Sequence, residues 1–172
     1  MESENKNGQR IKGDQIVSRT LELINSRTTM TLATAKNDSA WAAPVYYAYR
    51  RGFFYFFSNP EARHIVEGLI TSQSSAAIHS SSKEWRDICG IQMAGKIQRV
   101  PLGREAKNAF GAYMKKFPFC REFFSPGQLL DLTTFIGQFK VKLYKFKPNL
   151  VYYLDNRIRF GHRDLVDLPD SK

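Results

Sequence analysis

Apolar residues recur along the chain at two spacings, one typical of helices and the other of strands. Apolar positions three and four residues apart predict a helix over 14–25 and a longer one over 102–117. A short helix is predicted over 60–68, and short helical turns over 120–138. Runs rich in aromatic, β-branched or alternating apolar residues predict strands over 28–35, 40–49, 53–58, 74–79, 89–100, 139–147 and 149–155. The order of these elements predicts an α+β fold, an antiparallel barrel of six or seven strands with peripheral helices.

The segment 40–69 organises this pattern. Two aromatic runs are separated by an Arg-Arg-Gly sequence, whose glycine permits the turn of a β-hairpin. Asn59 is a suitable N-cap and Pro60 suits the first position of a helix, so we expect a helix to begin there. Arg63 and His64 then lie in its first turns, where free backbone N–H groups and cationic side chains can bind a phosphate. The alternative is a surface helix that only packs against the sheet.

Glycine and proline mark irregular points in the predicted sheet. Pro44 cannot donate to a strand ladder and therefore indicates an edge strand, a bulge or an opening in the sheet. Gly90 and Gly95 suggest a bulge or a close approach by another group. Pro148 separates the last two predicted strands.

Composition indicates one domain of ordinary globular make-up, since 42% of the 172 residues are hydrophobic. Residues 1–12 offer little to bury, so we expect a flexible tail followed by a single domain over 13–172. The net charge of +10 favours an anionic partner: nucleic acid, acidic lipid or a phosphorylated small molecule. The helix over 102–117 is aromatic and basic, as a nucleic-acid-binding helix is, but its apolar spacing favours packing in the core.

Residue types and spacings exclude several kinds of site. Cys89 and Cys120 form neither a Cys-x-x-Cys pair nor a disulfide framework, which indicates a reducing compartment. None of His64, His79 and His162 has a second ligand at metal-binding spacing, so no metal site is expected. Glycine-rich loops for dinucleotides or nucleoside triphosphates are missing. Without an apolar signal core or an apolar run of about 20 residues, a cytoplasmic protein that does not span a membrane is expected.

Four stretches carry a resemblance to a known family: 43–48 (Ala-Pro-Val-Tyr-Tyr-Ala), 58–69 (Ser-Asn-Pro-Glu-Ala-Arg-His-Ile-Val-Glu-Gly-Leu), 90–97 (Gly-Ile-Gln-Met-Ala-Gly-Lys-Ile), and 143–156 with 160–163. In this order they resemble the FMN-binding split-barrel proteins related to pyridoxamine 5'-phosphate oxidase. The resemblance covers about 16–168, and its last stretch is similar to a small uncharacterised branch. The vitamin B6 oxidases proper have a C-terminal segment rich in Arg and Trp, whereas this chain has no tryptophan after Trp85. The resemblance therefore argues against vitamin B6 oxidation.

The resemblance implies a homodimer with FMN at the interface, the phosphate just after the third strand and the ring against the second. Carried over by position, the cofactor-binding residues are Arg63, His64 and Ser58 at the phosphate, Val45, Tyr46 and Tyr47 along the ring or ribityl chain, Gln92 beside the flavin, and His162 or Arg163 reaching it across the interface. Because histidine titrates near ~6.5, cofactor affinity is expected to fall from mildly acidic to alkaline pH.

An oxidoreductase that transfers a hydride to or from flavin N5 is the function this resemblance implies. No catalytic acid or base is assigned, and the substrate is open. The first alternative is a flavin- or tetrapyrrole-binding protein without enzymatic activity. The second is a nucleic-acid-binding β-barrel, whose affinity should weaken steeply with salt.

Overall fold

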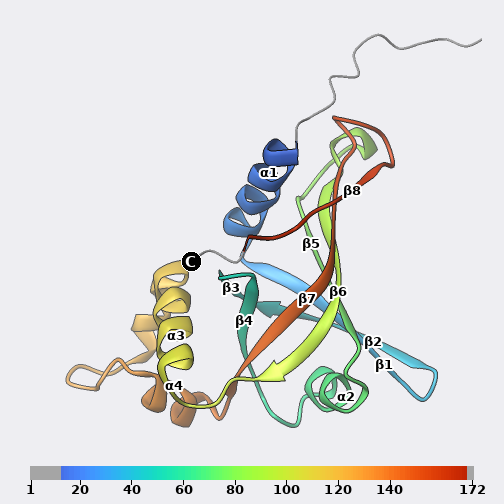
Figure 1. Cartoon of the computed structure of the whole chain (residues 1–172). Helices are drawn as coiled ribbons and strands as arrows, with labels where there is room; N and C mark the ends of the chain where they lie inside the picture. Colours follow the sequence, from blue (N-terminus) through green and yellow to red (C-terminus); the bar gives the residue numbers. More distant parts are fainter. Residues whose placement is uncertain (1–12, 170–172) are drawn as a thin grey trace, which may run out of the picture.

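One curled antiparallel sheet forms the centre of the molecule (Figure 1). The computed structural model describes residues 13–169, so the tail expected over 1–12 lies outside the described residues. The strands follow the order β2-β1-β5-β6-β7-β4-β3, and the short β8 pairs with β7. Their bounds are β1 (Thr29–Lys36), β2 (Ser39–Tyr46), β3 (Ala48–Arg50), β4 (Phe53–Ser58), β5 (Ser74–His79), β6 (Cys89–Arg99), β7 (Lys142–Asp155) and β8 (Arg163–Leu165). The predicted antiparallel α+β architecture is confirmed.

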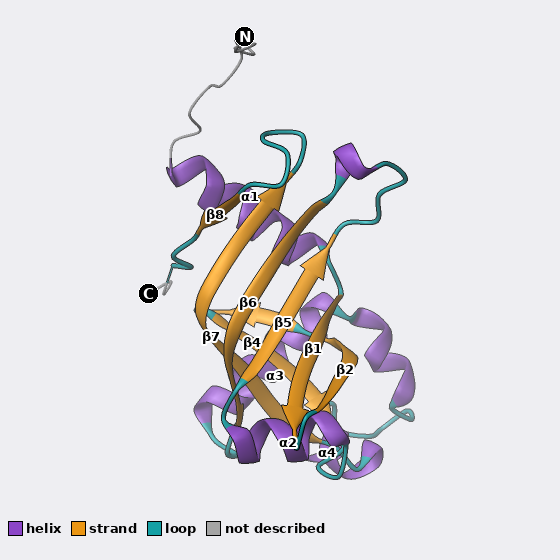
Figure 2. Ribbon diagram, turned by 90° about the vertical axis from the view of Figure 1, so that its right-hand side faces the viewer, coloured by secondary structure: helices purple, strands orange, loops and turns teal. Residues whose placement is uncertain are grey.

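Helices cover one side and the ends of this sheet (Figure 2). They are α1 (Gly13–Ser26), α2 (Arg63–Thr71), α3 (Arg104–Lys116) and α4 (Leu132–Phe139), with 3-10 turns η1 (Trp85–Asp87) and η2 (Pro118–Phe123). Seen from its other side, the sheet shows β7, β6, β5, β1 and β2 side by side with no helix in front of them (Figure 2).

Strand β4 separates two hydrophobic cores. Phe54 and Phe56 point into the curl of the sheet, while Tyr55 and Phe57 pack on the other face against α3 and α4. A strand covered on both faces favours an uninterrupted apolar run rather than alternation, which explains the sequence Phe-Phe-Tyr-Phe-Phe. The sheet is therefore anchored between its two cores at this strand.

The apolar stripe of α3 forms most of the second core, as its helical spacing predicts. The buried residues of α3 are Ala106, Ala109, Phe110, Tyr113 and Met114, and the C-cap residue Phe117 is buried beside them. Their burial leaves basic residues, but few aromatic rings of this helix, available to a nucleic acid. The aromatic rings of this helix therefore pack in the core, as its apolar spacing predicts.

The predicted strand over 40–49 is in fact two strands that belong to different ends of the sheet. The chain leaves β2 at Tyr47, whose ring is fully buried and whose hydroxyl donates to the carbonyl of Ile24 at 2.6 Å. Strand β2 pairs with β1, whereas β3 pairs with β4. Strand β2 is an edge of the sheet order, as expected from Pro44.

Strand β7 runs without interruption through Pro148, so the prediction of two separate strands is wrong. A β-bulge compensates for the proline: the β6–β7 register shifts between Ala94 and Gly95, and Gly95 lies opposite Pro148. A Cβ on Gly95 would lie 2.3 Å from the carbonyl oxygen of Lys147. The close approach expected at this glycine is therefore present.

Candidate functional site

Helix α2 begins at Arg63, three residues later than its sequence predicts. The side chain of Asn59 accepts a hydrogen bond from the backbone of Glu61 at 2.8 Å, which fixes a turn before the helix. Ala62 is the N-cap and provides no side-chain hydrogen bond. The first N–H groups of α2 have no acceptor inside the helix, so this end remains suited to an anion.

Arg63 is held over this helix start by three neighbours. Its Nε donates to Glu67 Oε1 at 2.7 Å, and its Nη2 donates to Ser39 Oγ at 2.7 Å. The guanidinium also lies 4.9 Å from the centre of the Trp41 ring. Nη1 has no partner among residues 13–169, and the side chain is 40% exposed. One edge of an oriented guanidinium is thus open to a ligand.

Glu67 orients Arg63 from the next turn of α2. It is buried and also accepts a hydrogen bond from Thr34 at 2.7 Å. The hydrogen bond from Arg63, followed by that from Thr34, holds the pKa of Glu67 below its usual value. Glu67 is therefore ionised at neutral pH and fixes the guanidinium through a charged hydrogen bond.

His64 and Ser58, two of the residues predicted at the phosphate, lie together behind this corner. Both are buried, and His64 Nε2 lies 3.0 Å from Ser58 Oγ. Burial lowers the pKa of His64 below its usual value, so the ring is neutral at neutral pH. This pair can exchange hydrogen bonds with a phosphate, while the fixed positive charge comes from Arg63.

The three residues of the second strand that are predicted to bind the ring do not all face the same way, because successive side chains of a strand point to opposite faces. The side chains of Val45 and Tyr47 are buried in the core, so they are unavailable to a ring on the surface. Tyr46 points the other way, is 50% exposed, and makes an edge contact with Phe117 at 5.3 Å. Of the three side chains, only that of Tyr46 is presented to the outer surface, and its contact with the ring stays a prediction.

The remaining predicted residues gather around β8. Arg163 Nε donates to Gln92 Oε1 at 2.8 Å, and His162 Nε2 lies 3.0 Å from Asp164 Oδ1. Helix α2 and strand β8 lie at opposite ends of the sheet (Figures 1 and 2). Within one chain, this group therefore does not join the corner formed by Arg63 and His64.

Sequence reasoning missed the residues that position Arg63. Ser39 and Trp41 come from β2, and Thr34 comes from β1. Only the i,i+4 spacing of Arg63 and Glu67 gave a local signal. The other contacts depend on how the β1–β2 hairpin packs on α2.

Three solved structures share the architecture. A heme-binding protein from Mycobacterium smegmatis aligns with a TM-score of 0.64 and 19% identity over 91% of this chain, which spans only 58% of that protein. A FAD-binding protein from Mesorhizobium loti has a TM-score of 0.59 and 17% identity over 78% of this chain and 90% of its own. A pyridoxamine 5'-phosphate oxidase-like protein from Listeria innocua has a TM-score of 0.61 and 11% identity, covering 81% and 98% respectively. The chain has the split-barrel fold.

No protein-family model matches this split barrel, and no curated protein matches it. Among residues 13–169, no helix is long and apolar enough to cross a membrane. Within the same range, no group of three or more histidine, cysteine or acidic residues is arranged to hold a metal ion.

Proposed function

We propose that this split barrel binds FMN, with the flavin phosphate at the start of α2. The observation that carries the proposal is the open Nη1 edge of Arg63, which lies beside a helix N-terminus that has no side-chain cap. A guanidinium and free backbone N–H groups are complementary to a phosphate that carries roughly −1.5 to −2 charge. The Mesorhizobium loti structure, described as FAD-binding, supports a flavin on this architecture.

Before a ligand binds, His64 is neutral at neutral pH, so His64 and Ser58 offer hydrogen bonds rather than charge. A bound phosphate dianion favours protonation of the imidazole, so binding should take up protons near neutral pH. This retains the expected decrease of affinity toward alkaline pH. Because burial lowers the pKa of His64 in the free protein, we expect the affinity for FMN to decrease at a more acidic pH than it would with an unperturbed histidine.

A homodimer across the uncovered sheet face completes the proposed site. This outer face is made of small and apolar residues on neighbouring strands: Thr31, Ala33, Ala35, Ala40, Ala42, Pro44, Tyr46, Ser75, Ala77, Ala94, Leu150 and Leu165. Leu165 is 65% exposed and Tyr46 is 50% exposed on it. A two-fold interface would bring the Gln92–Arg163 pair of a second copy toward the α2 corner of the first.

An oxidoreductase is the activity proposed for this dimer, since bound FMN supplies hydride transfer through its ring. The chain's own residues bind and orient the cofactor. Arg63 neutralises the phosphate, and Tyr46 offers an exposed aromatic ring on the same strand that carries Trp41. The positive charge of Arg163 is available to a reduced, anionic ring across the interface.

Fluorescence titration of cofactor-free protein with FMN and riboflavin tests the proposal. FMN should bind at least ~10-fold more tightly than riboflavin, because only FMN carries the phosphate. Arg63→Gln should weaken FMN about 10- to 100-fold and leave riboflavin affinity unchanged. Arg104→Gln, an exposed arginine at the start of α3, is the matched control and should change neither value. Equal binding of FMN and riboflavin, or no effect of Arg63→Gln, contradicts the phosphate assignment.

Heme binding is the second candidate, favoured by similarity to the heme-binding protein from Mycobacterium smegmatis. His79 is exposed on the outer face, and within residues 13–169 it forms a hydrogen bond through Nδ1 alone, so Nε2 is available as an axial ligand. Titration with hemin distinguishes the two candidates. Heme would be favoured if hemin gave a Soret band that depends on His79 and if FMN did not bind.

A further inference from the structure

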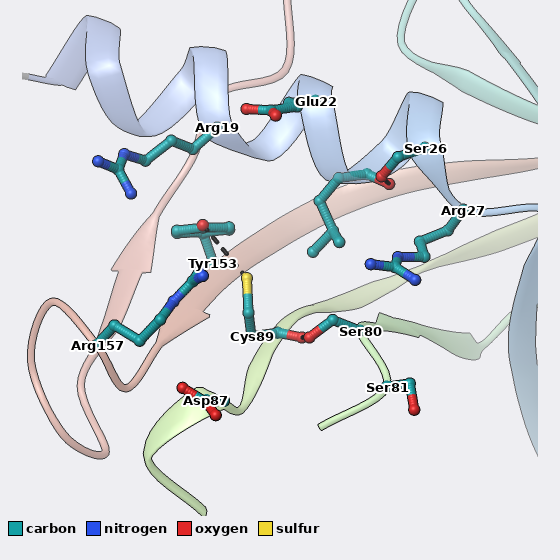
Figure 3. Close-up of a pocket in the computed structure, with 11 residues that line it drawn as sticks. Arg19, Glu22, Ser26, Arg27, Ser80, Ser81, Asp87, Cys89, Tyr153 and Arg157 are labelled. Carbon is teal, nitrogen blue, oxygen red and sulfur yellow. Dashed lines mark hydrogen bonds between the residues drawn. The ribbon is translucent and has the colours of Figure 1, made fainter. Parts of the chain in front are cut away.

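A second cavity, remote from the proposed flavin site, lies between α1, the connection from β5 to β6, and the end of β7 (Figure 3). Its volume is about 340 Å³, enough for a small metabolite. Helix α1 and helix α2 lie at opposite ends of the sheet (Figure 1). Buried Cys89 and Tyr153 form the floor, where the thiol lies 3.3 Å from the tyrosine hydroxyl.

Arginine side chains line this cavity from two directions (Figure 3). Arg27, just after α1, has a buried Nε with no hydrogen-bond partner among residues 13–169, and no carboxylate of that range lies within ion-pair distance of it. A buried guanidinium N–H without an acceptor is costly. A ligand oxygen would supply the missing acceptor.

Arg19 and Arg157 share a single buried carboxylate. Arg157 holds Asp155 with two hydrogen bonds, of 2.9 and 2.8 Å, while Arg19 lies 3.9 Å from the same carboxylate. Asp155 is thus occupied mainly by Arg157. Arg19 and Arg27 remain as two positive groups beside the cavity that are not fully paired.

The rest of the cavity is lined by hydroxyl groups and carboxylates, which can accept hydrogen bonds. Ser26 and Ser80 donate to backbone carbonyls at 3.2 and 3.1 Å, so their oxygens are left as acceptors, while Ser81 makes no hydrogen bond within the described chain. Glu22 and Asp87 also line the cavity, and neither forms an ion pair within the described chain. A bare anion would meet these carboxylates unfavourably, whereas ligand hydroxyl groups could donate to them.

We propose that this cavity binds a small hydroxylated phosphate ester of the sugar-phosphate class. The phosphate contacts Arg27 and Ser81, which lie on the same side of the cavity and together offer several hydrogen-bond donors (Figure 3). The hydroxyl groups of the ligand donate to Glu22, Asp87 and the serine oxygens. One end of the cavity thus recognises charge, and the other recognises the polyol.

Calorimetric titration with ribose 5-phosphate, inorganic phosphate and ribose tests this proposal. Ribose 5-phosphate should bind more tightly than inorganic phosphate, and ribose should give no heat. Arg27→Gln should weaken ribose 5-phosphate about 10- to 100-fold, while Arg104→Gln should leave it unchanged. Ser81→Ala, on an exposed loop, gives an independent loss of affinity if the arginine variant does not fold.

Glu22→Gln should strengthen the binding of the bare anion, whereas Arg27→Gln should weaken phosphate-ester binding. Inorganic phosphate should bind ~2- to 5-fold more tightly to this variant at low salt, and the advantage of ribose 5-phosphate should shrink. FMN affinity should be the same in the wild type and in Arg27→Gln, which separates this cavity from the flavin site. Absence of ribose 5-phosphate binding, or binding that Arg27→Gln leaves intact, overturns the proposal.

Discussion

At the scale of single residues, the α2 corner separates charge from hydrogen bonding. Arg63 is fixed by Glu67 and Ser39 through hydrogen bonds of 2.7 Å each, so its planar group is oriented before a ligand arrives. Such preorganisation lowers the entropy lost on binding. His64 and Ser58 lie behind it in a buried pair. The corner therefore offers one exposed cation and two neutral hydrogen-bonding groups.

The buried histidine predicts how stability depends on pH. Burial lowers the pKa of His64 in the folded protein, so the unfolded chain binds more protons below about pH 6.5. The free energy of unfolding of the cofactor-free protein should therefore be fully retained above that pH and fall as the pH drops below it. Urea unfolding at a series of pH values measures this slope.

His64→Gln should flatten this slope, because its amide does not titrate. The matched control is His79→Gln, which replaces an exposed histidine and should keep the slope. An unchanged slope in His64→Gln would show that His64 does not make this contribution.

At the scale of elements, the sequence predicts regular stretches well and their interruptions poorly. The apolar stripes of α1 and α3 predict these helices to within two residues at each end. The break at Tyr47 is hidden because both flanking runs are apolar and aromatic. For the same reason, sequence alone did not determine which of Val45, Tyr46 and Tyr47 faces outward. Their orientation depends on the pairing of β2 with β1.

Gly95 lies in the bulge that accommodates Pro148, and we expect a larger residue there to destabilise the protein. Gly95→Ala should destabilise the protein by about 1–3 kcal/mol, since the added methyl group would meet backbone of β7 that cannot move freely. Gly111→Ala is the matched control, because nothing lies within 4 Å of the added Cβ in the middle of α3. That change should stabilise by roughly 0.5–1 kcal/mol. Thermal unfolding of both variants measures the difference, and equal stabilities would refute the role of the bulge.

At the scale of the whole molecule, the predicted cofactor-binding residues form two groups, one at α2 and one around β8. The family resemblance implies that both groups contact the flavin. Within one chain, however, α2 and β8 lie apart (Figure 2). Only the relation between two copies could bring them together, and no local pattern in a sequence carries that relation. The outer face is the surface through which we propose that this occurs.

A charge placed at the centre of this face should abolish the dimer. Ala77 pairs with Thr31 on one side and Gln92 on the other, so Ala77→Arg puts a cation in the middle of the proposed interface. The variant should sediment as a folded monomer and bind FMN at least ~10-fold more weakly. Leu102→Arg, at a residue 68% exposed outside the face, should keep both dimer and affinity. A monomeric wild type would contradict the interface.

The most direct test of the flavin assignment is a crystal structure of the protein with FMN. We expect phosphate oxygens within about 2.7–3.2 Å of Arg63 Nη1 and of the first backbone N–H groups of α2, with the ring along β2 at a two-fold interface. A phosphate bound elsewhere, such as beside Arg27, or an α2 corner left empty at saturating FMN, would contradict this assignment.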